Sequence, residues 1–241
     1  MMIIDILLFI AVILLTGIVY PVNGFRHSKK RRIEIGSSER ARWYLASIIS
    51  AWIPAIIVFV TVVANGHSPS ELGLIKPVKI SGNPAIFYIV LLIATLYVLY
   101  NICTIFLLKS NKEFREKQWA NTPLLYRTML PTSRKERMIW RMLAVTAGIT
   151  EELIYRGYLF FALRLIFPTI TAISLILISS LLFSLGHLYQ REDFWKPATA
   201  GLFLSVTYYY TSSICIVVIL HIVQDLVAGE LSEVYNEDEQ Y

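Results

Sequence analysis

The stretch "IIDILLFIAVILLTGIVYPV" (residues 3–22) is almost entirely apolar. A helix needs about 20 such residues to cross the ~30 Å hydrocarbon core of a lipid bilayer. The run closes on Pro21 and is followed by Asn23 and Gly24, a pair that favours a turn. It has neither a basic start nor a small-residue cleavage site, so it predicts a retained membrane helix rather than a signal peptide.

Composition extends this interpretation to the whole chain. Of its 241 residues 56% are hydrophobic and only 16% are charged, and the mean hydropathy is +0.60, outside the balance of a soluble domain. The two cysteines, Cys103 and Cys215, both lie in apolar runs. Two cysteines in such positions exclude a disulfide framework and a cysteine-based zinc site. The apolar composition predicts a multi-pass membrane protein.

Positive charge is concentrated in residues 26–42 and 109–137, which account for most of the Lys and Arg. Basic loops remain on the cytoplasmic side, so we expect both segments there and the N-terminus outside. Neither segment has the interleaved stacking aromatics of a nucleic-acid surface, and no nucleic-acid partner is expected.

Six further apolar runs follow the first one, and we expect an all-α, polytopic transmembrane bundle of roughly seven spans. The stretch "PTSRKERMIWRML" (131–143) mixes basic and apolar positions, which predicts an additional interfacial amphipathic helix. The turn before the last run falls near residues 208–213, only ~12–15 Å from His221 at 1.5 Å per residue. Either this turn is misplaced or the sixth span is short or tilted. The later runs are residues 43–64, 85–108, 148–167, 172–188, 195–210 and 212–229.

The chain divides into three parts on these patterns. Residues 1–130 hold N-terminal spans and basic cytoplasmic loops, residues 131–229 hold a candidate catalytic core, and residues 230–241 form an acidic cytoplasmic tail.

The late spans carry nearly all of the intramembrane ionisable residues. A charge at the bilayer centre costs from ~2.5 to over 10 kcal/mol, so such groups normally pair with one another or face a wet cavity. In "GITEELIYRG" (148–157), Glu152 and Arg156 are four residues apart and can meet on one helix face, whereas Glu151 points about 100° away. A structural role for the Glu152–Arg156 pair alone is the simpler alternative.

His187 lies on the next span, and His221 and Asp225 lie four residues apart on the last one. A desolvated glutamate is a usable general base near neutral pH. Two imidazoles can hold a metal or donate hydrogen bonds to the oxyanion that forms when water attacks an amide. Both routes predict peptide hydrolysis. Asp225 is near the end of its span, so simple solvation is its alternative role.

Three segments, "EELIYR" (151–156), "FSLGH" (183–187) and "HIVQD" (221–225), resemble the motifs EExxxR, FxxxH and HxxxN/D in that order. These are the motifs of the CPBP (Abi) family, which includes CAAX prenyl endopeptidases and bacteriocin-processing enzymes. The resemblance covers about residues 131–229.

The resemblance implies a glutamate-dependent intramembrane endopeptidase. Glu151 would activate water, Glu152 and Arg156 would orient the site, and His187 and His221 would position water, bind metal or stabilise the oxyanion. Asp225 matches a position where prenyl-protein enzymes carry Asn, so it would bind metal or orient His221. If Zn²⁺ is used, the expected ligands are His187, His221, Glu151 and Asp225.

We therefore expect an endopeptidase of a bacterial plasma membrane whose site opens to the cytoplasm. The expected partners are membrane lipid and a peptide or lipid-anchored protein tail, in CAAX-type, pheromone or bacteriocin processing or in self-immunity. One alternative is a non-catalytic scaffold that regulates a sensor kinase or transporter. Another is an ion or proton transporter that uses the same residues as a relay, which the lack of an internal repeat disfavours.

Overall fold

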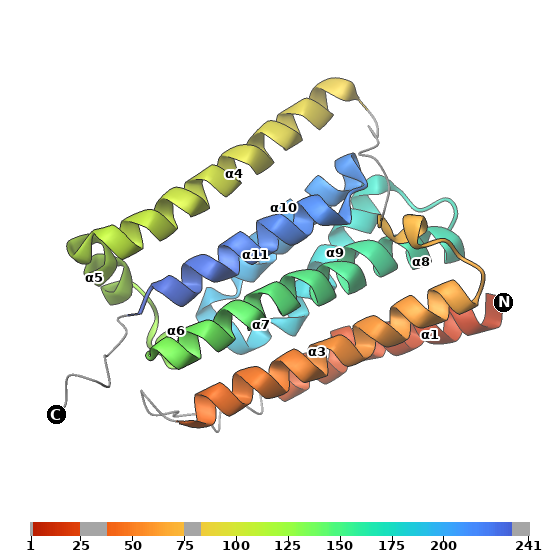
Figure 1. Cartoon of the computed structure of the whole chain (residues 1–241). Coiled ribbons are helices and arrows are strands. Elements are labelled where there is room, and N and C mark those ends of the chain that lie inside the picture. The colour runs from red at the N-terminus through yellow and green to blue at the C-terminus, as the bar shows by residue number, and fades with distance from the viewer. Residues whose placement is uncertain (1, 25–37, 75–82, 233–241) are drawn as a thin grey trace.

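A computed structural model describes residues 2–24, 38–74 and 83–232, and this part of the chain is helical, with no strand (Figure 1). The all-α prediction is confirmed. The first basic segment lies mostly outside the described residues. The elements are α1 (Met2–Leu14), η1 (Leu15–Val19), α3 (Ser38–Ala64), η2 (Pro69–Leu72), α4 (Pro84–Ser110), α5 (Lys112–Ala120), α6 (Leu124–Arg127), α7 (Arg134–Glu152), η3 (Leu153–Tyr158), α8 (Leu159–Ile166), α9 (Ala172–Gly186), η4 (Leu188–Asp193), α10 (Trp195–Thr211) and α11 (Ile214–Glu230).

Three helices are long and apolar enough to cross a membrane, namely Ile3–Gly24, Glu39–Ala64 and Pro84–Ser110. They coincide with the first three predicted spans, and their outward faces carry exposed side chains such as Ile49 and Leu92. Lipid-facing aliphatic side chains explain this exposure, so the chain is an integral membrane protein. Among the described residues no other helix is both long and apolar enough to be a candidate span, and the seven-span count stays a prediction.

The predicted amphipathic stretch is the start of α7 and runs on into the segment that carries the two glutamates. Ser133 caps the first turn of α7, with its side chain accepting from the Glu136 amide. From there α7, η3 and α8 continue through one π-helical segment to Ile166. The amphipathic stretch therefore forms the first turns of a helix that carries Glu151 and Glu152 at its far end.

The turn before the last helix lies where the sequence predicts it. α10 ends at Thr211, and Ser212 adopts a left-handed conformation with φ of 50°. α10 and α11 have 17 residues each, roughly 25 Å at 1.5 Å per residue. Of the two alternatives left by the sequence, the structure supports short helices rather than a misplaced turn.

α7 lies at the centre of the bundle, where it packs against α3 on one side and α11 on the other (Figure 1). α9 packs against α10, and α4 crosses α10 and α11. Glycine permits the close approach of α7 and α11, since a Cβ at Gly148 would lie 2.5 Å from Cγ1 of Ile222. Gly148 is about one turn before the two glutamates and Ile222 follows His221 directly, so this contact sets how near they come.

A buried arginine ties the start of α3 to the segment that leads into α7. Arg40 is fully buried and donates from Nη1 to the Leu130 carbonyl at 2.7 Å. Its Nε lies 3.3 Å from Oε1 of Glu136, which is also buried. The first turns of α3 and α7 are thereby held together.

Candidate active site

The structure draws the predicted site residues from three parts of the bundle. Glu151 and Glu152 end α7 and Arg156 lies in η3. His221 and Asp225 come from the middle of α11. His187 is the residue directly after α9, with φ of −104° and ψ of 10°, rather than part of the helix as the sequence predicts.

Glu152 is the centre of this arrangement. Its Oε1 accepts from Nη1 of Arg156 at 2.7 Å and also lies 2.7 Å from Nδ1 of His221. All three side chains are buried. The i,i+4 pair that the sequence predicts therefore exists, but the same oxygen also orients an imidazole 69 positions away.

Arg156 has two further contacts besides the one with the Glu152 carboxylate. Nη2 donates to the Gly201 carbonyl at 3.0 Å, and the guanidinium lies over the Phe183 ring, 4.5 Å from its centroid. The absence of a side chain at Gly201 permits this, because a Cβ there would lie 2.9 Å from the Phe183 ring. Contacts with α9 and α10 thus fix the Arg156 guanidinium, and this guanidinium in turn fixes the Glu152 carboxylate.

The other nitrogen of His221 faces the remaining two carboxylates. Nε2 lies 3.7 Å from Oδ2 of Asp225 and 4.0 Å from Oε2 of Glu151. That Glu151 oxygen is buried and has no hydrogen-bond partner among the described residues, although the side chain as a whole is 31% exposed. A separation of 4.0 Å between two polar atoms is suited to a bridging water.

The hydrogen-bond partners of His187 and His221 indicate which ring nitrogen of each carries a proton. Nδ1 of His221 faces a carboxylate that also accepts from Arg156, so it carries a proton. Nδ1 of His187 lies 2.9 Å from the Phe183 carbonyl oxygen, which can only accept, so it is also protonated. In the neutral form each imidazole presents an Nε2 lone pair, and an oxyanion-donor role requires the doubly protonated form.

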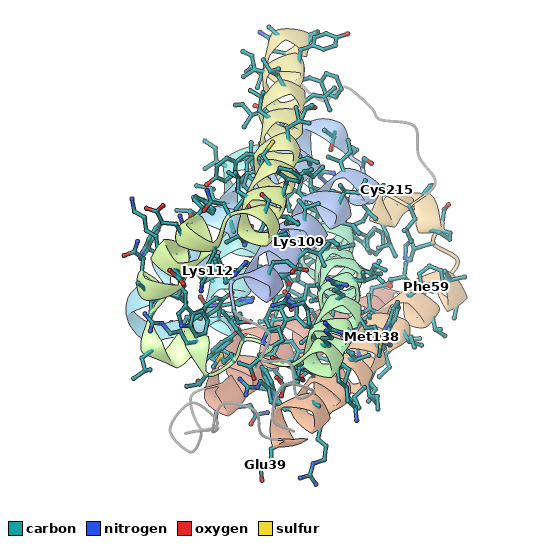
Figure 2. All side chains as sticks on the ribbon, turned by 60° about the vertical axis from the view of Figure 1, so that its left-hand side comes forward. Glu39, Phe59, Lys109, Lys112, Met138 and Cys215 are labelled. Carbon is teal, nitrogen blue, oxygen red and sulfur yellow. The ribbon has the colours of Figure 1, made fainter. Side chains whose placement is uncertain are left out.

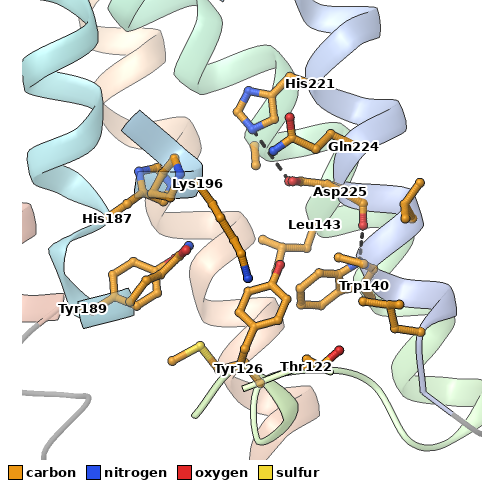
Figure 3. Close-up of a pocket in the computed structure, with 18 of the residues that line it drawn as sticks. Thr122, Tyr126, Trp140, Leu143, His187, Tyr189, Lys196, His221, Gln224 and Asp225 are labelled. Atoms are coloured by element: carbon orange, nitrogen blue, oxygen red, sulfur yellow. Dashed lines mark hydrogen bonds and ion pairs between the residues drawn. The ribbon is translucent and has the colours of Figure 1, made fainter. Parts of the chain in front are cut away.

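A cavity of about 530 Å³ joins these groups (Figure 3). Glu151, His187, His221 and Asp225 line it, together with residues of α3, α5, α10 and the α5–α6 turn. Figure 3 shows His187 on the wall across from His221 and Asp225. The structure therefore links Glu152, Arg156, His221 and Asp225 by contacts of 3.7 Å or less, and it places Glu151 and His187 on the same cavity.

The cavity also holds residues that the sequence did not single out. Tyr189, Lys196 and Gln224 line it, and Lys196 extends into it in Figure 3. Burial raises the pKa of the Tyr189 phenol to about 12, so this hydroxyl is a donor at neutral pH. Trp140 donates from Nε1 to the Asp225 carbonyl at 2.9 Å. Tyr189 follows His187, the last residue of the second motif, by two positions, and this nearness is the only signal in the sequence.

The four predicted zinc ligands do not form a compact ligand set in the described structure. Among the described residues no group of three or more His, Cys, Asp or Glu side chains is placed to hold a metal ion. Zinc ligands lie ~2.0–2.3 Å from the ion. Nδ1 of each imidazole is already committed to an oxygen within the protein, and only the Nε2 atoms remain for a ligand. Metal binding by His187, His221, Glu151 and Asp225 stays a prediction.

Comparison with known proteins gives one family match. Residues 133–227 match the model described as type II CAAX prenyl endopeptidase Rce1-like. No curated protein and no solved structure matched. The match covers α7, η3, α8, α9, α10 and most of α11, and so includes all six predicted site residues.

Proposed function

We propose that the Rce1-like type II CAAX prenyl endopeptidase domain formed by residues 133–227 hydrolyses a peptide bond at the cavity lined by Glu151 and His221. Membership in this family implies intramembrane protease activity. The observation that carries the proposal is the contact of Glu152 Oε1 with both Arg156 and His221, which leaves His221 Nε2 opposite the unpartnered oxygen of Glu151.

In this proposal Glu151 is the general base. A water between its Oε2 and His221 Nε2 attacks the carbonyl carbon of the scissile amide, and Glu151 accepts the proton that the water loses. The tetrahedral oxyanion is stabilised by a donor on the cavity wall, from His187 or a doubly protonated His221. Transfer of the proton from Glu151 to the amide nitrogen allows the C–N bond to break, which yields a carboxylic acid and an amine.

Glu152 and Arg156 act as positioning residues. Glu152 keeps His221 in the tautomer that directs Nε2 to the cavity, and Arg156 balances the buried charge of Glu152. Asp225 is 3.7 Å from the same Nε2 and restricts the ring from the cytoplasmic side of α11. A buried group that orients a histidine is a recurrent way to tune it.

The proposed substrate is a peptide or a lipid-anchored protein tail that enters from the cytoplasm, in a bacterial plasma membrane. Entry through this cavity is supported by residues of the basic segment 109–137, such as Gln118, Thr122 and Tyr126, which line it. Its wall combines aromatic and aliphatic side chains with few charges, which suits an apolar tail.

The test is cleavage of a membrane-attached reporter peptide by purified protein in lipid nanodiscs. Glu151→Gln and His187→Ala should each lower the rate by more than about 100-fold, whereas Glu116→Gln, an exposed carboxylate on α5, should not. Cleavage by Glu151→Gln at the wild-type rate would rule out Glu151 as the base, and absence of cleavage by the wild-type protein would favour the scaffold alternative. Adding a chelator to the wild-type protein separates the metal-dependent mechanism from the one without metal.

A further inference from the structure

Among the described residues, the end of α11 carries a surplus of positive charge around a single buried carboxylate. Glu230 is 5% exposed and its carboxylate contacts three cations from two other helices. Arg141 Nη2 lies at 2.7 Å, Arg137 Nη1 at 3.2 Å and Lys109 Nζ at 3.7 Å. One negative charge cannot balance three positive ones, so the group attracts a further anion.

Two of the three cations are accessible to such an anion. The side chains of Lys109 and Arg141 are 53% and 50% exposed, whereas that of Arg137 is only 20% exposed. Lys109 ends α4 and Arg141 lies on α7, so they approach Glu230 from either side of α11. The accessible charge therefore lies over the end of α11, between its two neighbours.

The same face of α11 is apolar beyond Glu230. At 100° per residue, Leu226, Val223, Ile219 and Cys215 lie within about 60° of Glu230 around the helix. Cys215 and Ile219 are exposed, and Val223 and Leu226 are partly exposed. Figure 2 labels Lys109 at the end of α4 and Cys215 near the opposite end of α11.

The length of this apolar face also matches the depth of one lipid leaflet. Glu230 and Ile219 are 11 positions apart, roughly 16 Å along the helix axis. Half of a hydrocarbon core is about 15 Å. A head group bound to the cations would leave its acyl chains beside this apolar face for the depth of one leaflet.

We propose that Lys109 and Arg141, with the outer face of α11, bind an anionic phospholipid of the cytoplasmic leaflet through its phosphate. Clusters of Lys and Arg at this level are known to attract acidic head groups, at about 1 kcal/mol per cation, or about fivefold in affinity. This site is separate from the proposed catalytic cavity, which Lys109, Arg141 and Glu230 do not line. It does not depend on protease activity.

Native mass spectrometry of the full-length protein in detergent tests the proposal, with dioleoyl phosphatidylglycerol and phosphatidylcholine as probes. The wild-type protein should retain phosphatidylglycerol at least tenfold more strongly. Lys109→Gln and Arg141→Gln should each lower that preference about fivefold. Lys112→Gln is the matched control, because its side chain is 73% exposed and pairs with Glu116 instead. Melting temperatures in detergent identify any variant that is misfolded, and Lys109→Arg should keep the preference.

Three outcomes would overturn the site. Equal retention of the two lipids would mean that another anion, such as the acidic residues after Ser232, neutralises the cations. Equal losses in Lys112→Gln and in the two site variants would mean non-specific attraction. Competition by glycerol 3-phosphate as strong as that by phosphatidylglycerol would identify a free phosphate, not a lipid, as the ligand.

Discussion

Glu151 and Glu152 are adjacent in the chain, but the protein surrounds them very differently. Glu152 is fully buried between Arg156 and His221, whereas Glu151 is partly exposed and leaves Oε2 without a partner in the described residues. A buried ion pair that loses one member leaves an uncompensated charge. One glutamate therefore stabilises the bundle, and the other is available for chemistry.

These surroundings predict opposite effects on stability. Glu152→Gln should lower the free energy of unfolding by about 3–5 kcal/mol, because Arg156 becomes a buried cation without its counterion. Glu151→Gln should change it by less than about 0.5 kcal/mol. Denaturation in mild detergent measures both, and cleavage of the reporter peptide should be lost in both. Equal stability losses in the two variants would contradict this division of roles.

At the scale of elements, close helix contact at glycine brings the site together. Gly148 lets α7 approach α11 at Ile222, and Gly201 lets α10 approach Phe183 on α9. The π-helical segment η3 then carries Arg156 between these two contacts. Such segments are frequent at functional sites. The sequence revealed the i,i+4 pairs within helices, but not which glycines decide the distances between helices.

Gly148→Ala should therefore disturb the site from outside it. The new Cβ would lie 2.5 Å from Ile222, which should cost about 1–3 kcal/mol and separate Glu152 from His221. Combining it with Ile222→Ala should restore part of the lost cleavage rate, since that change removes the clashing atom. Gly17→Ala is the control, because its nearest neighbour is Leu182 at an ordinary 3.5 Å. Failure of the double variant to recover any activity would argue against the spacing role.

At the scale of the whole molecule, one buried arginine connects the N-terminal part to the family domain. Arg40 of α3 contacts Glu136 of α7 and the backbone before it, and Tyr44 donates to the Met129 carbonyl at 2.5 Å. α3 is outside the matched residues 133–227, yet it forms one side of the cavity through Trp43 and Ser47. The N-terminal part is therefore required for the shape of the site.

Arg40→Met should destabilise the protein by about 3–5 kcal/mol, because Glu136 loses its buried partner. Arg40→Met combined with Glu136→Leu should be less destabilised than the single variant, since neither charge remains. Arg42→Met, two positions along and exposed, is the matched control and should change stability by under about 0.5 kcal/mol. Thermal unfolding of the wild-type protein, Arg40→Met, Glu136→Leu and their combination gives the double-mutant cycle, and strict additivity would contradict the contact.

The predicted orientation also belongs to this scale. In a protein with Cys103→Ser and Cys215→Ser, a single cysteine at Thr169 should react with a membrane-impermeant maleimide in intact cells. A cysteine at Lys117 should react only after the cells are permeabilised. Both positions are exposed, and they lie on the turn before α9 and on α5. The opposite pattern would reverse the assignment that rests on the basic segments.

The sequence by itself determined the membrane class and the first three spans, and it indicated the candidate site residues. These depend on local properties, namely the length of apolar runs, i,i+4 spacing and the cost of a charge in lipid. It also indicated the late turn at residues 208–213, which the structure has at Ser212. The order of the three motifs along the chain also indicated that these residues belong to one site.

Only the tertiary structure decided which of these residues touch. The contact of Glu152 with His221, the position of His187 beyond the end of α9, and the burial of Glu230 join positions far apart in the chain or depend on where a helix ends. The predicted acidic tail began at Glu230, yet this residue closes α11 and is enclosed by cations from α4 and α7. Side-chain periodicity acts over a few residues, whereas the packing of one helix against another depends on the whole bundle.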